Sequence, residues 1–391
     1  MTQAQSLLFT PTKLRDVTLR NRIVLSPMCT YSAGDGMASD WHAVHLGHFA
    51  LGGAGVVFTE VTAVTEQGRI TYGDLGVWSD AHIAPLKRVA DVVRSHGAVP
   101  AIQIGHAGRK ASSQRPWHGL EALTEADATA RNERPWPTVA PVAEAMAEGW
   151  HVPQALSVDE IHALVTAWRD AARRASEAGF DIVEVHCAHG YLGHQFLSPL
   201  INKRNDAYGG DRAGRMRFPL EVAEAVRAAW PKGKPVFVRI SSVDGMEGGW
   251  SLEDSVAFAK ELKARGIDAV DCSSGGVVGS ATARAVPRGF GFQVPFAETI
   301  RREAGIATVA VGLIVDGPQA EQILQDGKAD LIAVAREALY DPYWPRHAAR
   351  ALGADNGSYA NWPHQYGWWL DKREPHIRRL RGDRTQEGTS R

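Results

Sequence analysis

The chain has 391 residues, of which 44% are hydrophobic and 22% charged, and its formal net charge is -1. These values are typical of a globular protein, and the near-neutral charge provides no field that would steer the chain to nucleic acid or to a membrane surface. No run of about 18 apolar residues occurs, so the sequence predicts no membrane-spanning helix.

The number of cysteines and the N-terminal residues indicate the cellular compartment in which the protein is expected. Three cysteines are too few for a disulfide framework or for a four-cysteine iron–sulfur cluster, and they fit a reducing compartment. Residues 1–6 contain neither a basic patch nor a long apolar segment, so no signal peptide is expected. The sequence therefore predicts a cytoplasmic protein.

Short apolar runs alternate along the chain with longer amphipathic ones. The runs predicted to be strands are 23–26, 56–60, 99–104, 180–185, 236–240, 269–272, 309–312 and 331–334, with helices between most of them. This alternation predicts an α/β fold, a single (β/α)8 TIM barrel of parallel strands joined by right-handed crossovers. A doubly wound sheet is the competing architecture. It would need Gly-x-Gly-x-x-Gly at the start of its first helix, and the sequence has none there.

Several predicted helices begin at recognisable N-caps. Ser157, followed three residues later by Glu160, predicts a capping box. Ser251 is a second candidate cap, although Asp254 is shorter than the Glu or Gln that a capping box prefers. Another helix is expected near residues 219–230.

Two segments fall outside the barrel pattern. The insertion after the third strand, at about 112–156, is rich in Pro, Trp and Glu and is predicted to be a lid. The last barrel helix is followed by an aromatic segment and then by a basic tail from residue 372, which is expected to fray. We therefore expect a barrel domain over 1–361 and a partly mobile C-terminal extension over 362–391.

A pair of imidazoles is the clearest candidate for chemistry. His186 and His189 are followed by Tyr191, and all three are predicted to lie just past the strand at 180–185. In a barrel of parallel strands, catalytic groups collect at the C-terminal ends of the strands. Imidazoles can donate hydrogen bonds to a developing oxyanion, and a phenol can donate a proton. Taken alone, the two histidines could equally serve to tie down a loop.

Other distinctive residues also lie at the ends of predicted strands. They are residues 26–31, 103–110, 273–276, Arg239, Gly312, Ala335 and Arg336. The loops after strands seven and eight of such barrels form a phosphate site. Gly312 lets the backbone approach a phosphate closely, and Arg336 can clamp it. Each residue alone is explained by a turn or a surface ion pair, but their gathering at one end of the barrel indicates a site.

With these motifs the chain resembles the Old Yellow Enzyme family of FMN-dependent ene-reductases. The resemblance extends from about Leu8 to Asp341 and is carried, in order, by the motifs at 22–29, 67–69, 106–110, 178–181, 186–192, 195–199 and 208–210. Cys29 together with Tyr31 is typical of the thermophilic-like branch, which includes bacterial xenobiotic reductases and NADPH dehydrogenases. The yeast-type branch usually has Thr where Cys29 stands.

The resemblance implies non-covalent FMN across the barrel mouth, and no metal. Its phosphate would be held at Gly312, Ala335 and Arg336, while Cys29 would lie near flavin N5 and Arg239 would face flavin N1, where negative charge accumulates on reduction. The residues implied for cofactor binding are Ser26, Pro27, Met28, Cys29, Val61, Gln103, Arg239, Gly312, Ala335 and Arg336. Val61 would lie just past the second strand.

The resemblance also implies the reaction. Hydride from NADPH or NADH would pass through the flavin to the β-carbon of an alkene conjugated to a carbonyl or nitro group. His186 and His189 would bind the carbonyl or nitro oxygen with help from Tyr31, and Tyr191 would protonate the α-carbon. Because there is no Rossmann fingerprint, NAD(P)H would use the same pocket in turn, which gives ping-pong kinetics.

Two departures from the family are visible. Ala335 stands where members often have Gly before the phosphate-binding Arg. Relatives in this branch carry a C-terminal Arg that reaches a neighbouring subunit's site, whereas this chain has aromatic residues at 366–369. We expect Trp368 or Trp369 at the substrate mouth of its own or a neighbouring subunit, in a homodimer or a dimer-built tetramer.

Two other functions stay open on the residues alone. A barrel metallohydrolase would use His186 and His189 as ligands, although no carboxylate partner is evident. A flavin-binding redox sensor would use Cys29, for which the simpler interpretation is a small buried hydrophobe.

Overall fold

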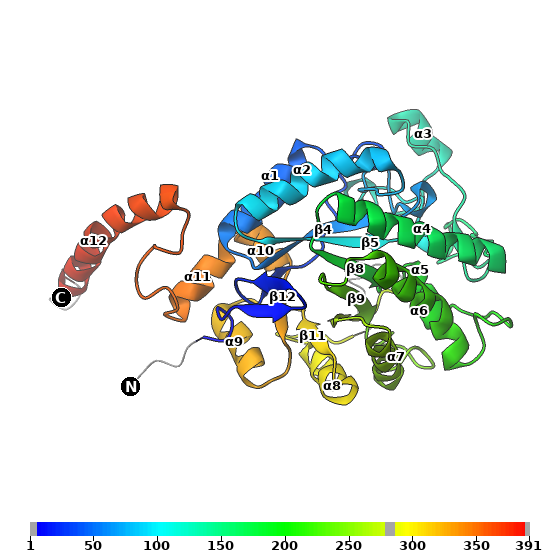
Figure 1. Ribbon diagram of the computed structural model, residues 1–391. Helices are drawn as coiled ribbons and strands as arrows, with labels where there is room; N and C mark the ends of the chain where they lie inside the picture. Colours follow the sequence, from blue (N-terminus) through cyan, green and yellow to red (C-terminus); the bar gives the residue numbers. More distant parts are fainter. Residues whose placement is uncertain (1–5, 278–285, 388–391) are drawn as a thin grey trace.

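The computed structural model describes residues 6–277 and 286–387, with side chains up to Gly382. Residues 1–5, 278–285 and 388–391, among them the end of the predicted tail, lie outside the described residues. The centre of the molecule is a closed barrel in which neighbouring strands are parallel (Figure 1). Around the barrel its strands are β10 (Ala269–Ser273), β11 (Ala307–Ala310), β12 (Leu331–Val334), β3 (Ile23–Leu25), β4 (Val56–Ala63), β5 (Val99–Gly105), β8 (Ile182–Cys187) and β9 (Val236–Ser241). The predicted TIM barrel is confirmed.

Helices cover the outside of the barrel, and their apolar faces pack with the outward-facing strand residues in one large cluster. The main ones are α1 (Asp40–Gly52), α2 (Ile83–Ser95), α4 (Val158–Glu177), α6 (Arg212–Ala229), α7 (Leu252–Ala264), α8 (Val294–Ala304) and α9 (Gly317–Gln325). Shorter ones are α5 (Leu192–Leu197), α10 (Arg336–Tyr340) and α11 (Trp344–Ala351). Within the described residues, no helix is long and apolar enough to cross a membrane.

A second apolar cluster fills the lower part of the barrel. It takes members from every barrel strand: Val24, Val56, Phe58, Ala101, Ile182, Phe237, Ala269, Val309, Leu331 and Ala333. Such a cluster can lie only inside the barrel. The hairpin of β1 (Thr12–Leu14) and β2 (Val17–Leu19) adds Leu19 to it, so the hairpin closes the end where the strands begin.

The predicted capping box at Ser157 and the predicted cap at Ser251 are both confirmed. The Ser157 hydroxyl accepts from the Glu160 N–H (3.3 Å), and the Glu160 carboxylate accepts from the Ser157 N–H (2.8 Å). Asp254 forms the same pair of bonds with Ser251, at 3.2 and 3.0 Å. The shorter acidic side chain therefore closes the box as well as Glu does.

Two predicted strand ends were wrong because the ladder continues through polar residues. His186 was placed past its strand, but it belongs to β8 and pairs in register with Arg239. Val61 was placed past the second strand, but β4 continues to Ala63 and Val61 pairs with Gln103 after a register shift. Cross-strand hydrogen bonding, rather than the apolar run, sets these ends.

Two other boundaries were also wrong. Gly312 does not close the seventh strand, because its φ of +116° and the φ of +52° at Leu313 do not fit extended backbone, and β11 ends at Ala310. The helix expected near 219–230 begins earlier, because the Asp211 carboxylate accepts from the Gly214 N–H (2.8 Å) and caps α6. Pro219 lies inside that helix instead of opening it.

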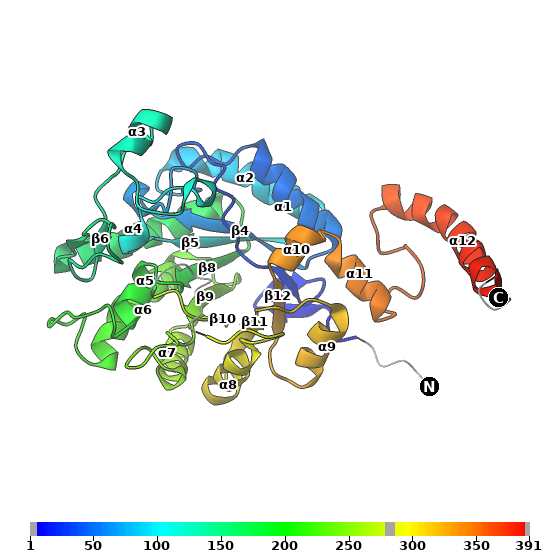
Figure 2. The ribbon, with the colours of Figure 1, turned by 180° about the vertical axis from the view of Figure 1, so that it is seen from behind.

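The insertion after β5 has structure of its own. It contains α3 (Glu125–Arg131) and the paired strands β6 (Val139–Ala140) and β7 (Gln154–Ala155). Figure 2 shows α3 projecting at one end of the molecule, opposite the C-terminal helix. The insertion contacts the loop after β3, where the Arg115 guanidinium donates to the Tyr31 carbonyl (3.2 Å) and the Trp117 ring lies edge-on to the Tyr31 ring. Its role as a lid stays a prediction.

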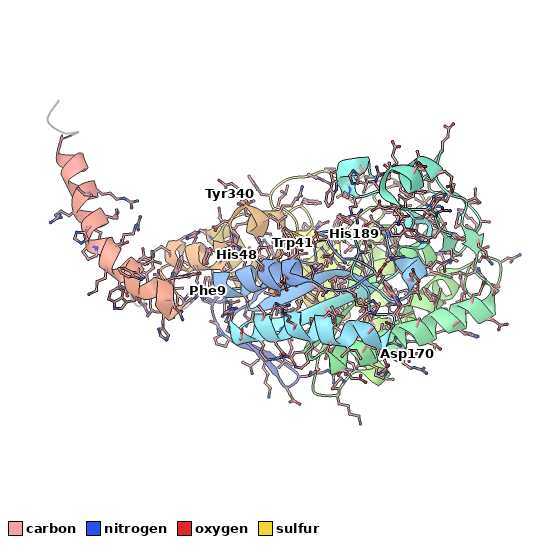
Figure 3. All side chains as sticks on the ribbon, turned by 90° about the horizontal axis from the view of Figure 1, so that it is seen from above. Phe9, Trp41, His48, Asp170, His189 and Tyr340 are labelled. Carbon is pink, nitrogen blue, oxygen red and sulfur yellow. The ribbon has the colours of Figure 1, made fainter. Side chains whose placement is uncertain are left out.

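The C-terminal segment forms α12 (His364–Glu387), which stands apart from the barrel (Figure 3). Before it, Trp362 stacks on Tyr343, with ring centroids 5.4 Å apart. Trp368 and Trp369 lie on α12 and are 58% and 67% exposed. The predicted division at 361–362 and the predicted mobility of the tail stay predictions.

Candidate active site

The inward-facing side chains become polar toward the C-terminal ends of four adjacent strands. Because side chains alternate along a strand, the positions two and four residues after each core residue also face inward. On β5, β8, β9 and β10 these series are Ala101, Gln103, Gly105; Ile182, Glu184, His186; Phe237, Arg239, Ser241; and Ala269, Asp271, Ser273. An apolar layer is thus followed by a charged layer and then by a layer of small and imidazole side chains at the mouth.

His186 is in the uppermost of these layers, and its hydrogen bonding fixes its tautomer. Its Nδ1 accepts from the Ala188 N–H (3.2 Å), so the proton of the neutral ring is on Nε2. Burial, and then the charge of Arg239, lower the pKa of His186 well below its usual value. The ring is therefore a neutral donor through Nε2 at physiological pH.

His189 follows the strand and is held by its backbone. It adopts a left-handed φ of +60°, its N–H donates to the Ser241 hydroxyl (2.9 Å), and its carbonyl accepts from Lys110 Nζ (2.8 Å). Its Nε2 lies 2.6 Å from the Ser273 hydroxyl. Burial and Arg239 also lower the pKa of His189 well below its usual value, so this ring is neutral too.

Tyr191 completes the group that the sequence predicted. The His186 and His189 rings lie 5.2 Å apart, and the Tyr191 ring lies 5.1 Å from His186. Burial, and then Cys29 and Asp74, raise the pKa of Tyr191 well above its usual value. Its phenol therefore keeps its proton. The structure brings together two neutral imidazoles and one protonated phenol.

Lys110 is a neighbour whose role the sequence analysis did not identify, although it lies in the quoted motif at 106–110. Besides binding the His189 carbonyl, its Nζ donates to the Gly276 carbonyl (2.5 Å) and lies 5.8 Å from the centre of the Tyr191 ring. Burial lowers its pKa to about 7. Only the folded barrel reveals that Lys110 joins the loops after β8 and β10.

The residues after β3 line another side of the mouth. Ser26 is buried, and its N–H donates to the Val334 carbonyl (3.0 Å), which brings the segment with Pro27 and Met28 close to the end of β12. Cys29 packs in a small apolar cluster with Val61 and Tyr191. Tyr31 has a left-handed φ of +52°. Burial, and then Glu60, raise the pKa of the Cys29 thiol, so it stays protonated.

A cavity of about 220 Å³ lies at the ends of β11 and β12, and His189 is part of its wall. The three predicted phosphate-binding residues, Gly312, Ala335 and Arg336, all line it. Ser273, from the distinctive segment 273–276, also lines it, as does Gln293, which sequence reasoning missed, and both side chains hydrogen bond to other residues of the wall. No local motif marks Gln293, which reaches the cavity from the start of α8.

Gly312 is required at this cavity for a local reason. Its φ is +116°, and a Cβ there would lie 2.9 Å from Gln293 Nε2 and 3.0 Å from the Phe292 ring. A side chain would therefore strain the backbone and fill the space that the cavity leaves open. The site accordingly offers an open glycine backbone and the Arg336 side chain at the end nearest β12.

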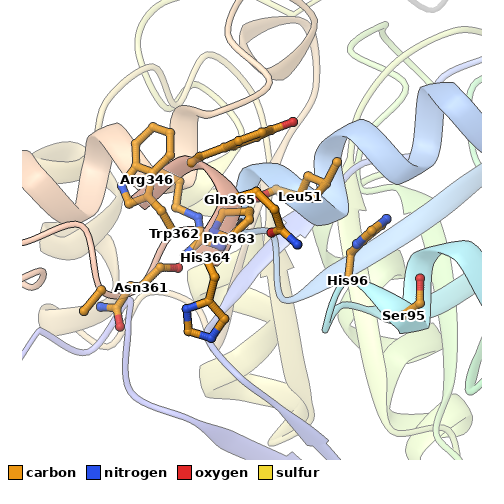
Figure 4. Close-up of a pocket in the computed structure, with 11 residues that line it drawn as sticks. Leu51, Ser95, His96, Arg346, Asn361, Trp362, Pro363, His364 and Gln365 are labelled. Atoms are coloured by element: carbon orange, nitrogen blue, oxygen red, sulfur yellow. Dashed lines mark hydrogen bonds between the residues drawn. The ribbon is translucent and has the colours of Figure 1, made fainter. Parts of the chain in front are cut away.

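A larger cavity of about 670 Å³ lies elsewhere, between the C-terminal segment and the ends of α1 and α2 (Figure 4). Its walls include Leu51, His96, Arg346 and Trp362, and none of the predicted site residues line it. Trp368 lies in neither cavity lining. The structure therefore does not bring Trp368 to the site of its own chain, and its contact with a neighbouring copy stays a prediction.

The geometry gives no support to the two alternative functions. Among the described residues, no group of three or more His, Cys, Asp and Glu side chains is arranged to hold a metal ion. The Nδ1 atom of His186 is already bonded to backbone, and Nε2 of His189 to Ser273. A Cys29 thiol with a raised pKa is a poor nucleophile, which disfavours a thiolate-based sensor.

The site fits FMN. Arg239 is a buried cation inside the barrel whose Nε forms no hydrogen bond among the described residues and lies 3.5 Å from Asp271 Oδ2, so the barrel interior holds a fixed positive charge below the mouth. The cavity at the ends of β11 and β12 offers the open backbone of Gly312 and the side chain of Arg336, groups suited to a phosphate. His189 lines this cavity, and its ring lies 5.2 Å from that of His186.

Comparisons with known proteins agree with this. The model of the NADH:flavin oxidoreductase / NADH oxidase family matches residues 7–355. The chain is 46% identical over 366 residues to a NADPH dehydrogenase of Geobacillus sp. (strain WCH70), covering 93% of this chain and 99% of the relative. It is 45% identical over 350 residues to a NADPH dehydrogenase of Geobacillus thermodenitrificans (strain NG80-2), covering 89% and 95%.

Solved structures show the same fold. Morphinone reductase superposes with a TM-score of 0.73 at 27% identity, covering 90% of this chain and 91% of that one. The old yellow enzyme homologue from Zymomonas mobilis superposes with a TM-score of 0.72 at 26% identity, covering 88% and 92%. With the family match over most of its length, the chain belongs to the NADH:flavin oxidoreductase / NADH oxidase family, that of Old Yellow Enzyme, and is an FMN-dependent NAD(P)H oxidoreductase.

Proposed function

We propose that this enzyme reduces the C=C bond of α,β-unsaturated carbonyl or nitro compounds with NAD(P)H as the reductant. The observation that carries the proposal is the grouping of two neutral imidazoles and a protonated phenol at the barrel mouth, with ring centroids 5.1 and 5.2 Å apart. This set supplies hydrogen-bond donors for an oxygen that gains negative charge and a proton for a carbon nearby.

His186 and His189 are proposed to bind the carbonyl or nitro oxygen. His186 has its Nε2 proton available because Nδ1 is occupied by the Ala188 N–H. His189 must release the Ser273 hydroxyl to donate through Nε2. As negative charge builds on the substrate oxygen, both hydrogen bonds strengthen, which lowers the barrier. Tyr31 is proposed to assist at the same oxygen.

Tyr191 is proposed to protonate the α-carbon. The environment that raises its pKa keeps the phenol protonated until a strong base, a developing carbanion, lies next to it. Lys110, which donates to the carbonyls of His189 and Gly276, keeps the loops after β8 and β10 in place.

The residues proposed to hold FMN are Ser26, Pro27, Met28, Cys29, Val61, Gln103 and Arg239 for the ring system and Gly312, Ala335 and Arg336 for the phosphate. Bound FMN supplies hydride transfer from its N5 atom. Arg239 stabilises negative charge on the ring because it is a fixed, buried cation. The protonated Cys29 thiol offers a weak S–H contact rather than a charge.

The nicotinamide nucleotide is proposed to enter the same pocket as the alkene and leave before it binds. The curated relatives named NADPH dehydrogenase support NADPH as a reductant. Shared use of one pocket predicts ping-pong kinetics. We also propose a homodimer or dimer-built tetramer, because the exposed Trp368 and Trp369 on α12 have no barrel surface to cover in their own chain.

The test is NADPH oxidation without oxygen against a panel of cyclic enones, maleimides and nitroalkenes. We expect the purified protein to carry flavin, to be reduced by NADPH and to be reoxidised by several of these alkenes, with parallel double-reciprocal plots. A protein that is reduced by NADPH but reoxidised by no member of the panel would refute the proposed substrate class.

A further inference from the structure

The charged layer inside the barrel contains more than the two residues assigned to the cofactor. Gln103 on β5, Glu184 on β8, Arg239 on β9 and Asp271 on β10 face inward at the same height, on four adjacent strands. All four are at least 94% buried, and Glu184 is fully buried. Glu184 and Asp271 are carboxyl groups for which neither the motifs nor the proposed chemistry gives a use.

The contacts of the two carboxyl groups differ. Asp271 is the partner of the cation, because its Oδ2 lies 3.5 Å from Arg239 Nε. Glu184 has a neutral partner, because its Oε1 accepts from the amide Nε2 of Gln103 at 2.7 Å. Among the described residues, Glu184 Oε2 and Asp271 Oδ1 accept no hydrogen bond.

The charges of this layer do not balance when both carboxyl groups are ionised. One guanidinium and two carboxylates leave a net charge of -1 in a place without solvent, which is costly. One added proton makes the layer neutral. Asp271 keeps its charge more readily, because it contacts the cation, whereas a neutral amide stabilises a carboxylate less at Glu184.

We propose that Glu184 is a positioning residue that is protonated at neutral pH, fixes the amide of Gln103 and leaves Arg239 paired with Asp271 alone. Through its Oε1 it accepts the amide N–H of Gln103, so the amide oxygen of Gln103 is the atom left for the flavin. Through its neutrality it leaves the field of Arg239 opposed by a single carboxylate instead of two. The two carboxyl groups thus set the orientation of the Gln103 amide and the electrostatic field of Arg239 at the proposed flavin site.

The electrostatics of the neighbours are consistent with this. Burial, and then Asp271, raise the pKa of Glu184 to about 8, even though Arg239 acts in the opposite direction. The other titratable groups close by are neutral: burial raises the pKa of Cys187 and Cys272 and lowers that of His186. Burial also raises the pKa of Asp271, but Arg239 opposes that rise, so Arg239 and Asp271 form the charged pair of this layer.

The experiment compares three variants of the purified, flavin-loaded protein. Glu184→Gln is isosteric, is permanently neutral and can still accept from Gln103. Glu184→Leu is neutral but cannot accept. Asp271→Asn removes the charge that balances Arg239. The readouts are the FMN dissociation constant, the flavin reduction potential and infrared difference spectra between the wild type and Glu184→Gln in D2O.

We expect Glu184→Gln to change the FMN dissociation constant and the reduction potential little, within about threefold for binding. Glu184→Leu should weaken FMN binding about tenfold, the factor for about 1.4 kcal/mol, because the Gln103 amide loses its orientation. Asp271→Asn should shift the reduction potential upward, because Arg239 loses its balancing charge. The infrared difference should show a protonated carboxyl group that is lost with Glu184→Gln and that ionises as the pH rises through about 8.

Two results would overturn the proposal. One is an infrared difference at pH 7 that contains only a carboxylate. The other is a Glu184→Gln variant that loses FMN as readily as Glu184→Leu does, or whose reduction potential shifts upward as it does for the loss of a carboxylate. The infrared measurement compares only the wild type with Glu184→Gln, so it tests the protonation of Glu184 even if Asp271→Asn does not fold. None of these readouts depends on alkene reduction, so a failure of the proposed substrate class is a separate result.

Discussion

The unequal hydrogen bonding of His186 and His189 leads to an unequal prediction. Both rings are proposed to donate to the substrate oxygen, yet only His189 has its Nε2 already bonded, to the Ser273 hydroxyl at 2.6 Å. The proton on Nε2 of His186 is available, because Nδ1 is the acceptor of the Ala188 N–H. Replacing each ring by Ala should therefore weaken oxyanion binding to different extents.

The magnitude follows from the kinds of hydrogen bond. A hydrogen bond to a charged oxygen is worth about 1.5–3 kcal/mol, so His186→Ala should weaken binding of a phenolate roughly tenfold to over a hundredfold. For His189, binding replaces an existing neutral hydrogen bond worth about 0.5–1.5 kcal/mol, so His189→Ala should cost less. The expected order of the loss is His186→Ala, then His189→Ala.

The assay is titration with a para-substituted phenol, followed by the change in the flavin absorption spectrum, together with the rate of enone reduction. His162→Ala is the matched control, since His162 is an exposed imidazole on α4 that bonds only to Tyr208 among the described residues. Flavin content should be the same in all three variants. If His186→Ala and His189→Ala bind phenols and reduce enones as the His162→Ala protein does, the proposed oxyanion site is wrong.

Four further predictions concern other parts of the molecule. Tyr191→Phe should slow alkene reduction but leave flavin reduction by NADPH unchanged, as stopped-flow measurement of the two half-reactions would reveal. Arg239→Met should lower the flavin reduction potential and the FMN content, and an unchanged potential at full occupancy would contradict its proposed place. Burial alone would raise the pKa of Asp244, but hydrogen bonds from His194, Ser198 and the Trp250 N–H outweigh it and lower that pKa, so these hydrogen bonds to the carboxylate stabilise the fold above about pH 4 and are lost as the pH falls further. Asp244→Asn should therefore cost about 1–3 kcal/mol in urea unfolding at pH 7, and the difference from wild type should shrink in acid. Truncation after Asn361 should change both the oligomeric state and the Michaelis constant for bulky enones. If the truncated protein keeps its oligomeric state and substrate range, α12 only covers its own chain.

Features that depend on neighbours in sequence were predictable. The box of Ser157 and Glu160 closes within one helical turn, so its residues predict it directly. The barrel strands were predictable because each is buried on both faces and reads as an apolar run. The end of β8 was misplaced, because what extends it to His186 is a partner on β9 more than fifty residues away.

Features that depend on distant neighbours were not predictable. Lys110 was visible in its motif, but its contacts are the carbonyls of His189 and Gly276, far along the chain. Gln293 has no motif and enters the cavity only because α8 begins beside β11. The position of Trp368 could not be predicted for the same reason. A segment rich in aromatic residues is expected to be buried, but its sequence does not indicate which surface covers it.

The layering inside the barrel has a thermodynamic consequence. Apolar side chains fill only its lower part, and above them the interior continues as polar groups and open space up to Gly312. At the proposed site the cofactor would form the uppermost layer of the core as well as act as a reagent. A ligand that binds only the folded state stabilises it by about 2.7 kcal/mol at a hundred times its dissociation constant. The melting temperature of this protein should accordingly rise with free FMN concentration, and loss of the cofactor should unfold the barrel from its mouth downward.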